Sequence, residues 1–212
     1  MKKTTDNKKE VAYFMRRLYN KGLTTTSGGN VSCRSEEGTI YITPSQTDKG
    51  RIRKHEIAEI TLEGINKTPE LKPSMETGMH LAIYRKRPDV KAIVHAHPVF
   101  ATVFAATGKT PCCKLSGEAR AILGELQIVP YQLMGTENLA EKTAEALSIG
   151  NVAIMQNHGA IAIGSSLLEA FDRLEVLEAT AKISFLTDLS GARKELSENE
   201  IEEIDRLMGN NK

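Results

Sequence analysis

A short apolar run that ends in two histidines places the strongest constraint on the fold of this chain. Ala92-Ile93-Val94 has the composition of a buried β-strand, and His95 and His97 follow it directly. Side chains alternate between the two faces of a strand, so positions 95 and 97 point to the same face, about 6–7 Å apart. Two imidazoles placed in this way can bind one metal ion. The alternative is a pair of polar strand-end residues that hydrogen-bond to the backbone.

Further residues extend the predicted metal site. His158, within Gln-Asn-His-Gly, is the third expected ligand, and three histidines leave one tetrahedral position open, as in catalytic sites. Glu76, in the first turn of a predicted helix, is either a ligand or base facing the metal, or an acid that stabilises the helix N-terminus. His80 lies four residues later, and we expect it to pack against Glu76 or backbone without binding metal. We interpret His55 as a solvated surface residue.

The rest of the pattern alternates helices with mostly short strands, without the strict order of a doubly wound fold. We expect helices over residues 6–21, 74–87, 137–148 and 166–189, after Pro98 as a first helical residue, and after Ser197. We expect strands over residues 31–34, 39–43, 92–97, 126–129, 152–156 and 160–163. This order predicts an α+β protein with helices flanking a central, mainly antiparallel sheet. No repeat or linker divides residues 1–212, so a single domain is expected.

Composition excludes several classes of function. The 28 basic and 27 acidic residues give a net charge of +1, which favours neither nucleic acid nor an anionic membrane as a partner. The polar N-terminal segment does not fit a signal peptide, and no apolar run is long enough for a membrane helix. The three cysteines lack zinc-binding spacing and are interpreted as reduced thiols, which indicates a cytoplasmic protein.

Three polar loops could bind an anion. Residues 27–30, with sequence Ser-Gly-Gly-Asn, combine backbone freedom with exposed amides. Ser45 and Ser74 add hydroxyls, and Ser74 is expected to cap a helix, where phosphate binds readily. Taken alone, each loop is interpreted as a plain turn or cap. Together they permit a small phosphoester, whereas no P-loop or dinucleotide motif is present.

Five motifs occur in one order, at residues 27–32, 42–45, 72–76, 94–98 and 156–159. Over residues 8–190 the chain thereby resembles the class II aldolase/adducin family, most closely its L-fuculose-1-phosphate aldolase branch, leaving 191–212 as a C-terminal tail. The resemblance implies a three-layer αβα fold and a cyclic homotetramer with interfacial active sites. It implies one zinc ion per subunit and reversible cleavage of a sugar phosphate to dihydroxyacetone phosphate and L-lactaldehyde. The implied site residues are the metal ligands His95, His97, His158 and Glu76, with Glu76 also the base, and the phosphate-binding residues Gly29, Asn30, Ser45 and Ser74.

The chain departs from that branch at two places. Gln46 and Met75 replace a glycine and a serine, which removes one phosphate hydroxyl. Residues 115–118 lack the tyrosine that protonates the aldehyde oxygen, so Glu118 is the substitute acid/base candidate, or else a plain helix-start acid. Family alternatives are a ribulose-5-phosphate 4-epimerase, a rhamnulose-phosphate aldolase, a methylthioribulose-phosphate dehydratase and a non-catalytic adducin-like scaffold.

Overall fold

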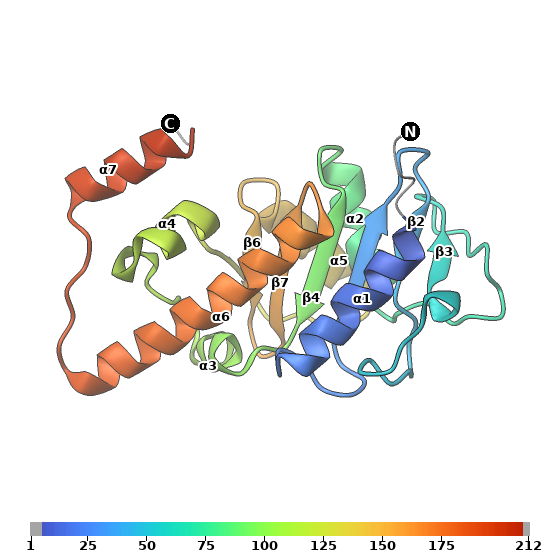
Figure 1. The fold of residues 1–212 in the computed structure, drawn as a ribbon, viewed down its shortest axis with the longest axis horizontal. Coiled ribbons are helices and arrows are strands. Elements are labelled where there is room, and N and C mark those ends of the chain that lie inside the picture. Colours follow the sequence, from blue (N-terminus) through green and yellow to red (C-terminus); the bar gives the residue numbers. More distant parts are fainter. Residues whose placement is uncertain (1–5, 210–212) are drawn as a thin grey trace.

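The computed structural model describes residues 6–209, which form one seven-stranded sheet (Figure 1). The strand order is β3-β2-β1-β4-β7-β6-β5, and every pairing except the parallel β5–β6 is antiparallel. The strands are β1 (Asn30–Arg34), β2 (Ile40–Ile42), β3 (Ala58–Ile60), β4 (Ala92–Ala96), β5 (Gln127–Val129), β6 (Val152–Met155) and β7 (Gly159–Gly164). The helices are α1 (Asn7–Asn20), α2 (Thr77–Lys86), α3 (Val99–Thr107), α4 (Gly117–Leu123), α5 (Glu137–Ala146), α6 (Leu167–Ser190) and α7 (Glu198–Leu207).

Helices cover both faces of the sheet, which confirms the three-layer αβα prediction. Along β4, Ala92 and Val94 enter a core with α1, α3, α4 and α6, while Ile93 enters a second core with α2 and α5. This alternation is what a strand buried on both faces requires. In β1, Val31 and Cys33 join the first core, so Asn30 and Ser32 face the α2 side.

Side-chain caps set the start of several helices. The side chains of Asp6, Ser116, Thr136 and Ser166 each accept a backbone N–H bond at the N-terminus of α1, α4, α5 and α6. The helix predicted after Ser197 is confirmed as α7, and Ser197 forms a capping box in which Glu200 also bonds back to the Ser197 backbone. These bonds satisfy N–H groups that a helix cannot satisfy internally.

The prediction that Ser74 caps α2 is wrong. Helix α2 begins at Thr77, and Glu76 occupies the cap position without a side-chain capping bond. The Ser74 hydroxyl accepts instead from the Glu76 backbone N–H at 3.3 Å, within a tight turn that precedes the helix. Met75, within the range expected to be helical, lies before the helix and is 64% exposed. Pro98 likewise lies at the cap of α3 and not inside it.

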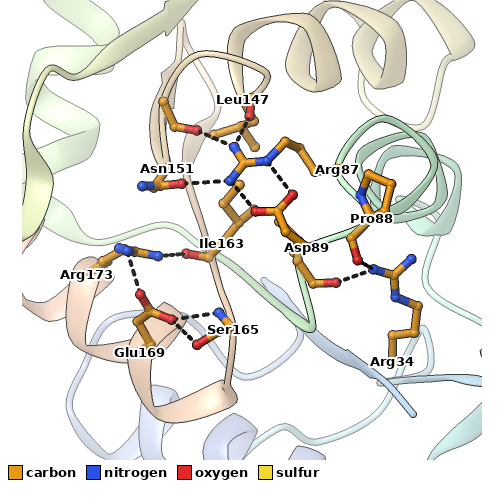
Figure 2. Close-up of polar contacts among 12 residues, drawn as sticks. Arg34, Arg87, Pro88, Asp89, Leu147, Asn151, Ile163, Ser165, Glu169 and Arg173 are labelled. Atoms are coloured by element: carbon orange, nitrogen blue, oxygen red, sulfur yellow. Dashed lines mark hydrogen bonds and ion pairs between the residues drawn. The ribbon is translucent and has the colours of Figure 1, made fainter. Parts of the chain in front are cut away.

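An arginine clamp closes the end of the sheet where β4 begins (Figure 2). Arg87, after α2, donates to the carbonyl oxygens of Leu147 and Gly150 at 2.8 and 3.4 Å and forms an ion pair with Asp89. Arg34 donates to the Val90 carbonyl oxygen at 2.6 Å. The clamp therefore ties the α2–β4 connection to the α5–β6 connection.

The C-terminal half of α6, together with α4 and α7, lies to one side of the sheet (Figure 1). Helix α7 is attached to α4 by Arg120, whose Nε lies 2.8 Å from Asp205 Oδ1. Helix α6 ends at Ser190, where the tail was predicted to begin, although the domain boundary itself stays a prediction. Among residues 6–209, no helix combines the length and apolarity needed to cross a membrane.

Candidate metal centre

The two histidines of the His-x-His motif lie at the end of β4, and the third comes from the neighbouring hairpin. Strand β4 pairs with β7, with Ala96 opposite Ala160. The three-residue turn between β6 and β7 therefore comes next to His97 and carries His158. Asn157 in that turn has φ 52°, a left-handed conformation that asparagine tolerates better than most residues.

The structure brings the three predicted histidines together. His95 Nε2 lies 3.2 Å from His97 Nε2, and the His158 ring centroid lies 4.9 Å from that of His95. One ligand nitrogen from each ring falls within 4.8 Å of the others. His95 Nδ1 lies 2.9 Å from the Ala160 carbonyl oxygen, and this bond directs its Nε2 into the cluster.

The Glu76 carboxylate lies beside the histidines, and its role as a metal ligand or base stays a prediction. Its Oε2 lies 3.0 Å from His95 Nε2, and its Oε1 lies 3.0 Å from His158 Nε2. Burial opposes ionisation of Glu76, but the charge of His95 and the close contacts of the carboxylate with both rings hold its pKa well below the usual range. The same carboxylate raises the pKa of His95, although burial of the ring opposes this.

The His97 ring lies in a cradle formed by two glycines. A Cβ atom at Gly159 would lie 2.5 Å from His97 Cδ2, and one at Gly28 would lie 3.0 Å from His97 Nδ1. Burial, followed by the charges of His95 and His158, lowers the pKa of His97 to about 4. The ring is therefore neutral at physiological pH, as metal binding requires.

The residues of the cluster fit a divalent metal ion. Three imidazole nitrogens and one carboxylate are the ligand types of catalytic zinc sites. Among the described residues, the buried Glu76 Oε1 has no hydrogen-bond partner of good geometry, despite its ion pair with His158. A buried oxygen of this kind indicates a missing partner. An ion coordinated by these four side chains would supply it.

The residues predicted to bind phosphate lie around Glu76. Asn30 Nδ2 donates to Glu76 Oε2 at 2.8 Å, and Gly29 beside it has φ 66° and lies against the His95 carbonyl oxygen. Ser45 Oγ donates to the Pro73 carbonyl oxygen at 2.9 Å, which places the Ser45 and Ser74 loops side by side. Their role in binding phosphate stays a prediction.

The structure places Glu118 and His80 outside the histidine cluster. Glu118 is exposed in the first turn of α4 and is not a member of the histidine cluster. His80 is fully buried outside the metal site, as predicted, but the expectation that its side chain pairs with Glu76 or backbone is wrong. Its ring lies between Asn30 and Ser32, because both polar side chains of β1 face α2.

Sequence reasoning did not identify the residues that pack against His97 or hydrogen-bond to His80. Gly28 and Gly159 form the His97 cradle, and Ser32 and Tyr84 belong to the hydrogen-bonded group around His80. The signal that could have found Ser32 is its i+2 relation to Asn30 on a strand whose other face is apolar. The glycine contacts depend on strand pairing and have no local signal.

Comparison with known proteins decides the family. The Class II Aldolase and Adducin N-terminal domain model matches residues 9–185. This chain belongs to that family. An L-fuculose phosphate aldolase of Methanocaldococcus jannaschii is 37% identical over 180 residues, covering 85% of this chain and 96% of the relative.

Other relatives show how broad the family chemistry is. A 3-oxo-tetronate 4-phosphate decarboxylase of Haemophilus influenzae is 31% identical, covering 90% of this chain and 91% of the relative. A solved L-fuculose 1-phosphate aldolase superposes with a TM-score of 0.89 at 32% identity, covering 97% of both chains. Aldolases and decarboxylases are both carbon–carbon lyases, and the chain is accordingly a class II lyase. Class II aldolases depend on a metal ion, and the three histidines here form a group that could hold one.

Proposed function

We propose that this protein is a zinc-dependent aldolase that cleaves L-fuculose 1-phosphate reversibly to dihydroxyacetone phosphate and L-lactaldehyde. The observation that carries the proposal is the meeting of His95, His97 and His158 with the Glu76 carboxylate at one point. A zinc ion held by these residues would act as a Lewis acid toward the ketose carbonyl. The relatedness to fuculose-phosphate aldolases favours this substrate.

The chain's own residues would perform proton transfer and phosphate binding. Glu76 would donate a proton to the carbon atom that loses its bond to the aldehyde, and would remove that proton during condensation. Gly29, Asn30, Ser45 and Ser74 would bind the phosphate through backbone amides, an amide side chain and hydroxyls. The three loops that carry these residues are already joined to one another and to Glu76 by hydrogen bonds.

We further propose a homotetramer whose active sites lie between subunits. Ile183, Leu186 and Leu189 on α6 are exposed, which supports burial of this helix against another copy. An interfacial site would also allow Glu118 of one copy to act as the acid/base in another. Light scattering coupled to size-exclusion chromatography would measure the mass in solution, and a monomer would exclude this arrangement.

A second candidate function is decarboxylation of a 3-oxo sugar acid phosphate. It is favoured by the absence of a tyrosine among residues 115–118, because loss of carbon dioxide leaves no aldehyde oxygen to protonate. The decarboxylase relative supports the same alternative. Both reactions use a carbonyl polarised by the metal and a proton donor at the freed carbon.

The two functions are separated by their products. The zinc-loaded protein is incubated with L-fuculose 1-phosphate and, separately, with 3-oxo-tetronate 4-phosphate. Dihydroxyacetone phosphate is followed with a coupled reductase, and carbon dioxide is trapped. Release of dihydroxyacetone phosphate from L-fuculose 1-phosphate supports the aldolase, whereas release of carbon dioxide together with dihydroxyacetone phosphate from 3-oxo-tetronate 4-phosphate supports the decarboxylase.

A Glu76→Gln variant tests the role of the carboxylate in either reaction. It should retain the fold and bound zinc but lose turnover by at least about 100-fold, the contribution typical of general acid–base catalysis. Zinc content by elemental analysis and unfolding midpoint serve as controls. Near wild-type turnover would exclude Glu76 as the proton carrier.

A further inference from the structure

Behind Glu76, four side chains form a continuous buried hydrogen-bond chain. Asn30 Nδ2 lies 2.8 Å from Glu76 Oε2, and Asn30 Oδ1 lies 2.5 Å from His80 Nε2. His80 Nδ1 lies 2.7 Å from Ser32 Oγ, which in turn lies 2.8 Å from the Tyr84 hydroxyl oxygen. Relative exposures are 3% for Asn30 and at most 1% for His80, Ser32 and Tyr84, so these groups satisfy one another and not solvent.

The direction of the chain follows from the chemistry of its members. A carboxylate only accepts hydrogen bonds, so Asn30 presents its N–H to Glu76 and its carbonyl oxygen to His80. That oxygen also only accepts, so His80 carries its proton on Nε2. The ring is fully buried and its two nitrogens meet only the neutral side chains of Asn30 and Ser32, so the ring stays neutral and Nδ1 is an acceptor. Ser32 therefore donates to His80, and Tyr84, whose phenol pKa burial raises, donates to Ser32.

We propose that Tyr84, Ser32 and His80 are positioning residues whose one-directional chain holds the Asn30 amide with its N–H toward Glu76. Every donor in this chain points toward the carboxylate, and successive hydrogen bonds polarise one another. Glu76 thus keeps a fixed donor when it changes between binding metal and moving a proton. The catalytic part of this inference rests on the proposed function, whereas the direction of the chain does not.

The tautomer of His80 tests the direction of the chain in the wild-type protein. Long-range proton–nitrogen NMR spectra of histidine-labelled protein would be recorded with chelator and with zinc, and His80→Gln would assign the signal. The expected form has a proton on Nε2 and none on Nδ1 in both samples. A proton on Nδ1, or on both nitrogens at neutral pH, would overturn the proposal.

Two substitutions at His80 test the effect on the metal site. His80→Gln can still donate to Asn30 Oδ1, whereas His80→Leu cannot. Zinc affinity, measured by chelator competition, should fall roughly 10–100-fold in His80→Leu, as for other groups that orient metal ligands, and only a few-fold in His80→Gln. With substrate, kcat should fall more than KM rises in His80→Leu.

A matched control separates positioning from general loss of stability. Thr143 is also a fully buried polar residue, but it lies on α5 and its hydroxyl contacts the Met155 sulfur at 3.9 Å. Thr143→Val should leave zinc affinity unchanged even where its unfolding midpoint moves. Equal zinc affinity in His80→Leu and wild type, or equal losses in both His80 variants, would refute the positioning role. The His80 tautomer and the zinc affinities could agree with expectation while no sugar phosphate is cleaved. In that case the proposed function fails, but the direction of the hydrogen-bond chain stands.

Discussion

Replacing Gly159 by alanine tests the His97 cradle directly. An added Cβ would lie 2.5 Å from His97 Cδ2 and 2.6 Å from the Ala96 carbonyl oxygen. Both distances are far below van der Waals contact. The Ala96 oxygen belongs to the backbone of β4, which is paired with β7 at Ala96 and Ala160. The clash therefore cannot be relieved by rotating one side chain.

The expected magnitude has two parts. Forcing a methyl group into a packed site costs about 1–3 kcal/mol of the free energy of unfolding. Displacement of the His97 ring should also weaken zinc binding roughly 10–100-fold, as for other changes that disturb ligand orientation. That loss corresponds to about 1.4–2.8 kcal/mol. The variant should therefore be destabilised with chelator present, and zinc should restore less stability than in the wild type.

Urea unfolding with chelator and with zinc measures both parts, and Gly78→Ala provides the matched control. Gly78 lies in α2, and a Cβ there meets no atom within 4 Å. Since alanine is the better helix former, Gly78→Ala should raise stability by about 0.5–1 kcal/mol and leave zinc affinity unchanged. The same glycine-to-alanine change is therefore expected to lower the free energy of unfolding at position 159 and to raise it at position 78. Wild-type stability and zinc affinity in Gly159→Ala would show that the glycine does not support His97.

Two further predictions concern residues away from the metal ligands. Lys49 is 1% exposed, and burial lowers its pKa from the ordinary 10.5 to about 8, so the unfolded chain binds this proton more tightly than the folded one. Its contribution to stability should therefore rise between pH 8 and 10.5: the unfolding free energy of wild type minus that of Lys49→Met should increase by up to about 3 kcal/mol. A pH-independent difference in urea unfolding would contradict this. Arg87→Leu should cost about 1–3 kcal/mol, because the Leu147 and Gly150 carbonyl oxygens lose their donor, yet leave zinc affinity unchanged at the opposite end of β4. Weaker zinc binding in that variant would show that the clamp and the metal centre are coupled.

The histidine pair of the candidate metal centre could be predicted from the sequence because its geometry is local. Strand alternation alone places His95 and His97 on one face, and both rings do point to one cluster. The contact with His158 has no such local signal, since no periodicity links residues 97 and 158. The continuous apolar runs of β4 and β6 likewise fit strands that are buried on both faces, as a sheet between two helical layers requires.

Competing hydrogen bonds explain where the local prediction failed. Serine before an apolar helical stripe predicts a cap, but the Ser74 hydroxyl accepts from Glu76, only two residues along the chain. Helix α2 therefore starts later, and Glu76 leaves the helical turn to reach the histidines. Whether the Ser74 hydroxyl caps the helix or accepts from the Glu76 N–H depends on the partners of Glu76, which come from β1, β4 and the β6–β7 turn.

The partners of His80 show the same limit in a different form. Helical spacing puts His80 and Glu76 on one face, which predicts a direct contact, but both side chains meet Asn30 instead. Asn30 and Ser32 are polar residues on a strand whose opposite face packs in an apolar core. Polar groups on a fully buried strand face require partners, and the facing helix α2 provides them at positions 80 and 84, one helical turn apart. Strand alternation and helix spacing together would therefore have predicted the buried hydrogen-bond chain, whereas neither pattern predicts it alone.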